Sequence, residues 1–131
     1  MQIASKESTM PGLYDDTIPI GELSDRTGVS VRALRYYDQN DLLNAVRTSA
    51  GHRRFRPADV ESVRRIRLLL NAGLPLAVVS QVIPCFLDDG ARLHACVSDY
   101  LRAHLQTVQA RMEALDEQQG TIRLLQQLVV A

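Results

Sequence analysis

The chain has no run of about 20 apolar residues, the length that a helix needs to cross a bilayer. It also lacks the apolar core of a secretory signal after Met1. We therefore expect a cytoplasmic protein. No nucleophile with a neighbouring base, no glycine-rich phosphate loop and no catalytic carboxylate pair can be found, so an enzyme is not expected.

Lysine is almost absent, because Lys6 is the only one among 15 basic residues. The formal net charge is 0, which does not by itself suggest nucleic acid. Residues 26–67, however, hold ten arginines against four carboxylates. Phosphate contacts require such local positive charge, and arginine binds phosphate and base edges bidentately. A GC-rich genome explains the preference for arginine equally well.

Residues 20–38 have the pattern of two short helices joined by a tight turn. Gly28 can end the first helix in the left-handed conformation, and Val29 is expected to be buried under the turn. Ser30 is a suitable N-cap for a second helix over 31–39. This pattern predicts a helix-turn-helix, whose second helix enters the major groove of DNA.

Helical periodicity divides the second helix into two faces. The inward residues are expected to be Val31, Leu34 and Tyr37, and the outward residues Arg32, Arg35 and Tyr36. Arginine can read guanine and tyrosine can donate to phosphate, so the outward face suits DNA. The alternative is a plain helical hairpin with two solvated arginines.

A basic β-hairpin is expected to follow, and it argues against that alternative. Its strands would cover 46–48 and 52–55, with a turn through 49–51. A histidine and three arginines lie between positions 52 and 56. Such a hairpin beside a helix-turn-helix is a wing, which contacts the backbone or minor groove.

Further helices are expected over 57–71 and from Pro75 to a kink or end at Pro84, with a loop at 88–90. From about 91 to 128 there is no proline, and apolar residues recur by steps of three and four, as in a coiled coil. About 36 residues predict a rod of roughly 54 Å. The expected seam comprises Val97, Leu101, Leu105, Val108, Met112, Leu115, Gln119 and Ile122.

The rod cannot bury its apolar seam alone, so we expect it to pair with another helix. Gln119, a polar residue in the seam, can set the register of that pair. Folding of the rod back onto its own domain is the alternative.

In its order of motifs the chain resembles the MerR family of transcription regulators. The matching motifs are IGEL at 20–23, TGVS at 27–30, RYYD at 35–38, GHRRF at 51–55, DV at 59–60, IR at 66–67 and AGLPL at 72–76. The resemblance covers roughly 17–128. It implies a mainly α fold: a winged helix-turn-helix domain with a small β-hairpin wing, and a long C-terminal helix that pairs antiparallel in a homodimer.

The expected organisation is a disordered tail at 1–16, the DNA-binding domain at 17–87, and a linker with the coiled-coil helix at 88–131. We expect no separate effector domain. A homodimer would read a pseudo-palindromic operator. By resemblance, it would bend and underwind an overlong promoter spacer so that RNA polymerase engages both promoter elements.

We expect the DNA contacts to come from the helix starts, the recognition helix and the wing. The candidates are Thr17, Ser30, Arg32, Arg35, Tyr36, Tyr37, His52, Arg53, Arg54 and Arg56.

The two cysteines, Cys85 and Cys96, leave three readings open. In mercury-sensing members the position of Cys96 holds a metal ligand, but the partner thiolates past the rod are missing here. Cys85, His94 and Cys96 could hold a thiol-bound metal, the two thiols could be a redox pair, or both could be packed hydrophobes. No resident cofactor is expected.

The alternative function is ligand sequestration, in which the protein would bind a small effector in apolar grooves. Its candidate lining is Phe86, Leu87, Tyr100 and Met112. Loss of function on removal of the wing arginines would distinguish a regulator from such a protein.

Overall fold

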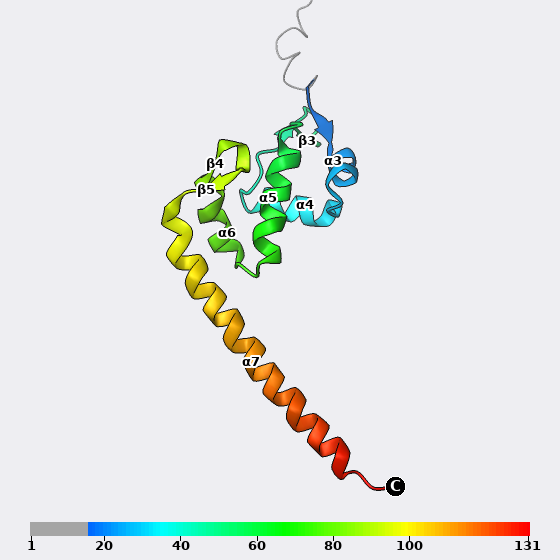
Figure 1. Ribbon diagram of the computed structural model, residues 1–131. Helices are drawn as coiled ribbons and strands as arrows, with labels where there is room; N and C mark the ends of the chain where they lie inside the picture. Colours follow the sequence, from blue (N-terminus) through cyan, green and yellow to red (C-terminus); the bar gives the residue numbers. More distant parts are fainter. Residues whose placement is uncertain (1–15) are drawn as a thin grey trace, which may run out of the picture. The chain divides into compact units, whose positions relative to one another are not determined.

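The computed structural model describes residues 16–131 and is mainly helical (Figure 1). The chain divides into two compact units, the first ending at Pro84 and the second comprising Cys85–Ala131. We expected the division after position 87. It falls earlier because Phe86 and Leu87 pair with a strand of the second unit. The predicted tail, apart from Asp16, lies outside the described residues.

The first unit contains the expected helix-turn-helix, formed by α3 (Ile20–Thr27) and α4 (Val31–Gln39). Gly28 ends α3 with φ 73°, in the left-handed region that favours glycine. The Ser30 hydroxyl caps α4 by accepting a hydrogen bond from the Ala33 backbone N–H at 3.1 Å. Val29 is buried between the helices, as predicted.

The wing is part of a three-stranded antiparallel sheet rather than an isolated hairpin. β2 (Val46–Arg47) and β1 (Ile18–Pro19) both pair with β3 (Arg53–Phe55), which is the central strand. The wing strands are slightly shorter than predicted. β1 was not predicted, because two residues ahead of a helix carry too little alternation to indicate a strand.

The core of the first unit is formed by side chains from every one of its longer elements. α5 (Asp59–Asn71) packs against α3, and α6 (Leu76–Val82) packs against α5. Pro84 lies in the 3₁₀ turn Ile83–Cys85 that follows α6, as the sequence led us to expect. The largest fully buried side chains are Phe55, Leu23, Leu34, Ile66, Val63 and Val79.

The second unit begins with a hairpin that was not predicted. β4 (Phe86–Leu87) pairs with β5 (Arg92–Leu93) around the short 3₁₀ turn η2 (Asp88–Gly90). The turn η3 (Ala95–Val97) then leads into α7 (Ser98–Leu128).

The prediction that the rod starts near 91 is therefore wrong. Strand pairing and the two 3₁₀ turns take up the residues before Ser98, and Val97 lies in η3 rather than on the rod. The 31 residues of α7 give a length of about 46 Å.

No residue of α7 is buried, although the helix carries a row of large apolar side chains. The exposed members are Tyr100, Leu105, Met112, Leu115, Ile122, Leu124, Leu125 and Leu128. Over residues 16–131, no helix combines the length and apolar character required to cross a membrane.

Candidate nucleic-acid interface

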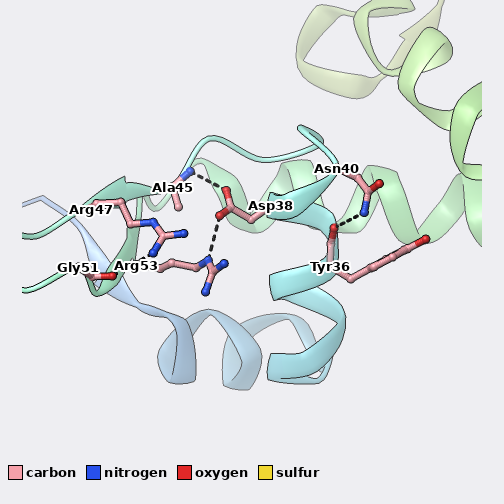
Figure 2. Close-up of polar contacts among 7 residues, drawn as sticks. All are labelled: Tyr36, Asp38, Asn40, Ala45, Arg47, Gly51 and Arg53. Atoms are coloured by element: carbon pink, nitrogen blue, oxygen red, sulfur yellow. Dashed lines mark hydrogen bonds and ion pairs between the residues drawn. The ribbon is translucent and has the colours of Figure 1, made fainter.

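The exposed face of α4 is the one that the periodicity predicted. Arg32, Arg35 and Tyr36 are exposed, whereas Leu34 and Tyr37 are buried. In Figure 2 the Tyr36 ring points away from the side chains of Asp38 and Arg53. The two arginines and Tyr36 therefore present donors outward from the second helix of the motif.

Tyr37 is the sequence-predicted contact that the structure least favours for DNA. Its side chain is only 5 % exposed. Burial raises the pKa of its phenol, and the charge of Arg67 only partly offsets this effect. The inward orientation expected from periodicity is correct, so we assign Tyr37 to the core.

Asp38 connects the end of α4 to the wing, a role that the sequence did not reveal. One carboxylate oxygen accepts a hydrogen bond from the Ala45 backbone N–H at 3.1 Å, and the other pairs with Arg53 Nε at 3.0 Å (Figure 2). The side chains of Arg53 and Asp38 are only 18 % and 12 % exposed. The orientation of the wing relative to α4 therefore depends on this carboxylate.

Arg54 and Thr17 form a second internal connection. Arg54 Nε donates to the Thr17 hydroxyl at 3.0 Å, and Nη2 donates to the Thr17 carbonyl at 2.8 Å. Thr17 is 8 % exposed. Both were candidate DNA contacts, but here they join the chain just before β1 to the central strand, which favours a structural role.

The exposed histidine and arginine side chains of the wing lie at its tip and its base. His52 is exposed in the turn, and Arg56 is exposed with its guanidinium donating to the Asn44 carbonyl at 3.3 Å. Arg47 on β2 is also exposed, and it donates to the Gly51 carbonyl at 3.0 Å (Figure 2). Arg47 was not among the candidates because only the return strand was considered.

The recognition helix and the wing border a common hollow on the surface of the first unit. Its lining residues are Pro19, Ile20, Arg35, Gly51, His52 and Arg53. Ser30, at the start of α4, is also exposed, with its hydroxyl oxygen used in the helix cap. The tertiary fold thus brings Arg35 of α4 next to His52 and Arg53 of the wing, and a concave surface with arginine and histidine donors suits a phosphate backbone.

The candidate metal ligands of the second unit are only partly brought together. The Sγ atoms of Cys85 and Cys96 are 3.8 Å apart. His94 turns its Nδ1 to the backbone N–H of Cys96, at 3.0 Å, instead of to the thiols. Within residues 16–131 there is no group of three or more His, Cys, Asp or Glu side chains arranged to hold a metal ion.

The residues of the alternative ligand site do not share a single environment. Tyr100 stacks on His104 with ring centroids 6.0 Å apart. Met112 lies in a groove of α7 that it shares with seam residues further along the helix, including Leu115 and Ile122. Phe86 and Leu87 form β4.

The helix-turn-helix, its exposed cationic helix and the flanking hairpin define the first unit as a winged helix-turn-helix domain. The family model of the MerR HTH family of regulatory proteins matches residues 18–84, and the chain belongs to this family. The family and the matched regulators are transcription regulators and not enzymes.

Among known proteins, the chain is 32 % identical to the nodulation protein NolA of Bradyrhizobium sp. strain NC92, over 79 % of this chain and 41 % of NolA. It thus spans less than half the length of that relative. The N-terminal part of MtaN, the multidrug transporter activator of Bacillus subtilis, has a similar fold with a TM-score of 0.64 and 24 % identity, over 86 % of this chain and 99 % of that chain.

A second solved structure, of HiNmlR, is that of a MerR family regulator lacking the sensor domain, bound to promoter DNA. Its TM-score is 0.53 at 23 % identity, with 79 % of each chain covered. Because both sequence identities are low, the two structural similarities show that the fold is shared and nothing more.

Proposed function

We propose that this chain is a transcription regulator that acts in the cytoplasm and binds a pseudo-palindromic operator in double-stranded DNA as a homodimer. The observation that carries the proposal is the hollow shared by Arg35 of α4 and by His52 and Arg53 of the wing. HiNmlR, a member of the same family with a similar fold, was solved on promoter DNA.

Within this interface we propose a division of labour among the arginines. Arg32 is exposed in the first turn of α4 and Arg35 one turn further on, on the face by which a recognition helix meets base edges, and they read the sequence. Arg47 and Arg56 are exposed on the wing and neutralise phosphates. Arg53 and Arg54 keep the sheet and the wing in place through Asp38 and Thr17.

The dimer is proposed from the exposed seam of α7. Met112, Leu115 and Ile122 are 64 %, 62 % and 56 % exposed in the single chain. Each of these side chains gains about 1.5–3 kcal/mol when it is fully buried. A second copy of α7, antiparallel to the first, covers the same row on both helices and relates two recognition helices by a two-fold axis.

For the mode of regulation, we propose that the dimer bends and underwinds an overlong promoter spacer, so that RNA polymerase can engage both promoter elements. Family membership supports this mechanism, and the deformation energy of the spacer would provide the switch. A footprint outside promoter spacers, or one without a change in DNA twist, would contradict it.

The direct test compares two single substitutions on DNA selected by the protein from a random pool. Arg32→Ala should reduce the preference for the selected base by about 1–3 kcal/mol, because a bidentate base contact is lost. Arg56→Ala should weaken binding to all sequences and lower the slope of log affinity against log salt by about 1, because one phosphate contact is lost.

Leu68→Ala is a suitable control, because Leu68 lies on α5 with 62 % of its side chain exposed and should not change DNA affinity. If both arginine variants altered affinity in the same way, the proposed division would be wrong. If the protein selected no sequence from the pool, the proposed function itself would be wrong.

A further inference from the structure

Cys85 and Cys96 lie at the two ends of the hairpin that opens the second unit. Cys85 immediately precedes β4, and Phe86 of β4 pairs with Leu93 of β5. The His94 backbone N–H donates to the Cys85 carbonyl at 2.8 Å and continues the ladder by one pair. Backbone pairing therefore brings together two thiols that are 11 positions apart, with a separation of 3.8 Å between their Sγ atoms.

The His94 side chain fixes the turn that returns Cys96 to Cys85. Its Nδ1 accepts the Cys96 backbone N–H at 3.0 Å and caps η3. Neither cysteine is in a disulfide; Cys85 is half-buried and Cys96 is exposed. The pair is thus held close by the backbone and is open to a small oxidant.

We propose that Cys85 and Cys96 are a redox modification site, which a peroxide converts to an intrachain disulfide. The sulfur atoms must approach from 3.8 Å to the S–S bond length, a movement of about 1.8 Å, because a disulfide bond is about 2.05 Å long. This proposal does not depend on the proposed DNA binding.

The reaction needs one peroxide and proceeds in two displacements. Partial burial raises the pKa of the Cys85 thiol and the neighbouring Cys96 raises it further, so Cys85 is the weaker first nucleophile. The exposed Cys96 thiolate attacks one peroxide oxygen; the O–O bond breaks, a sulfenic acid forms, and the departing hydroxide takes a proton to leave as water.

Cys85 then attacks the sulfenic sulfur of Cys96. The S–S bond forms, the S–O bond breaks, and the thiol proton of Cys85 leaves with the hydroxyl as a second water. In sum, two thiols are oxidised and one hydrogen peroxide is reduced to two waters. The crosslink then restrains the residues immediately before α7, which begins at Ser98.

The experiment uses the full chain, reduced, freed of reductant, kept in a metal chelator and treated with one equivalent of hydrogen peroxide. Arg92 lies between the cysteines, so trypsin separates them into peptides 68–92 and 93–102. We expect these peptides to be joined by a disulfide, the intact monomer to lose about 2 Da, and dithiothreitol to reverse both changes.

Two results would overturn the proposal. One is separate oxidation of the two peptides to sulfinic acids with no joined pair. The other is a joined pair found only in covalent dimers, whose yield rises with protein concentration. The fraction of disulfide that forms within one chain rather than between chains should instead be independent of protein concentration.

Three variants distinguish the effect of the proximity of Cys85 and Cys96 from the reactivity of each thiol by itself. Cys85→Ser should give no joined peptides and should leave a Cys96 sulfenic acid that dimedone captures. Cys96→Ser should react with peroxide several-fold more slowly than Cys85→Ser, and equal rates would contradict the order of attack. His94→Ala should slow disulfide formation while the reactivity of Cys96 towards dimedone after peroxide treatment is preserved.

Discussion

The two units differ in what they do with their apolar side chains. The first unit encloses Leu23, Leu34, Phe55 and Ile66 almost completely among its own helices and sheet. α7 in the second unit buries none of its residues and leaves large apolar side chains exposed along its length. A unit with an enclosed core can fold on its own, whereas an amphipathic helix with an exposed seam is stabilised by a partner.

The largest effect is expected in the core of the first unit. Phe55→Ala on β3 removes a side chain with no exposed surface, and it should lower the free energy of unfolding by about 3–5 kcal/mol. Chemical denaturation followed by circular dichroism measures this change. Leu68→Ala, at an exposed position of α5, should change stability by less than about 0.5 kcal/mol. Equal losses in the two variants would mean that the core is not where the structure places it.

Substitutions in the seam of α7 should instead change association and leave the stability of the first unit unaffected, because the seam is buried only when two chains associate. Leu115→Gln should remove about 1.5–3 kcal/mol of apolar burial per chain, so the proposed dimer should weaken about 100-fold or more. Sedimentation equilibrium measures the association, and the melting of the first unit should remain unchanged. Ala110→Gln, about half a turn from the seam, is the matched control and should leave the dimer intact. Unchanged association of Leu115→Gln would indicate that this face is not the interface.

A smaller loss of stability is expected at Asp38, which orients the wing relative to α4 in the first unit. Asp38→Ala leaves the Arg53 guanidinium and the Ala45 N–H without their acceptor, which should cost about 1–3 kcal/mol of stability. DNA affinity should fall for all sequences, because the wing loses its connection to α4. A double-mutant cycle with Arg53→Ala measures the coupling. Additive losses would show that the two side chains act independently.

The smallest expected effect is a change in how stability depends on alkaline pH, and it comes from Tyr37. Burial raises the pKa of Tyr37 above its usual value of about 10, because the fold favours the neutral phenol. The stabilisation that this preference provides is fully present below the unfolded pKa and is lost as pH rises through the folded pKa. Tyr37→Phe should therefore lose less stability than the wild type between neutral pH and pH above about 10. Thermal melting across this range tests the difference, with Tyr36→Phe, at a 53 % exposed position, as the control.

The helix-turn-helix could be predicted from the sequence because its signals are local. The turn at Gly28 and the cap at Ser30 act within a few residues, and the outward positions of Arg32 and Arg35 follow from helical periodicity. The same holds for the exposed row on α7, although its start was misplaced. Short strands such as β1 and β4 have too few residues to carry a periodic pattern, and they were missed.

The sequence by itself thus determined the class of domain, the charge of its recognition helix and the existence of an apolar seam. Only the tertiary structure decided which basic residues of the wing face outward and which are engaged inside the unit. Arg53 and Arg54 resemble their neighbours in the sequence, yet Asp38 and Thr17, which lie far from them along the chain, engage their guanidinium groups. The proximity of Cys85 to Cys96 was likewise decided by strand pairing. Such pairings depend on which segments the fold brings together, whereas caps and periodicity depend on neighbours along the chain.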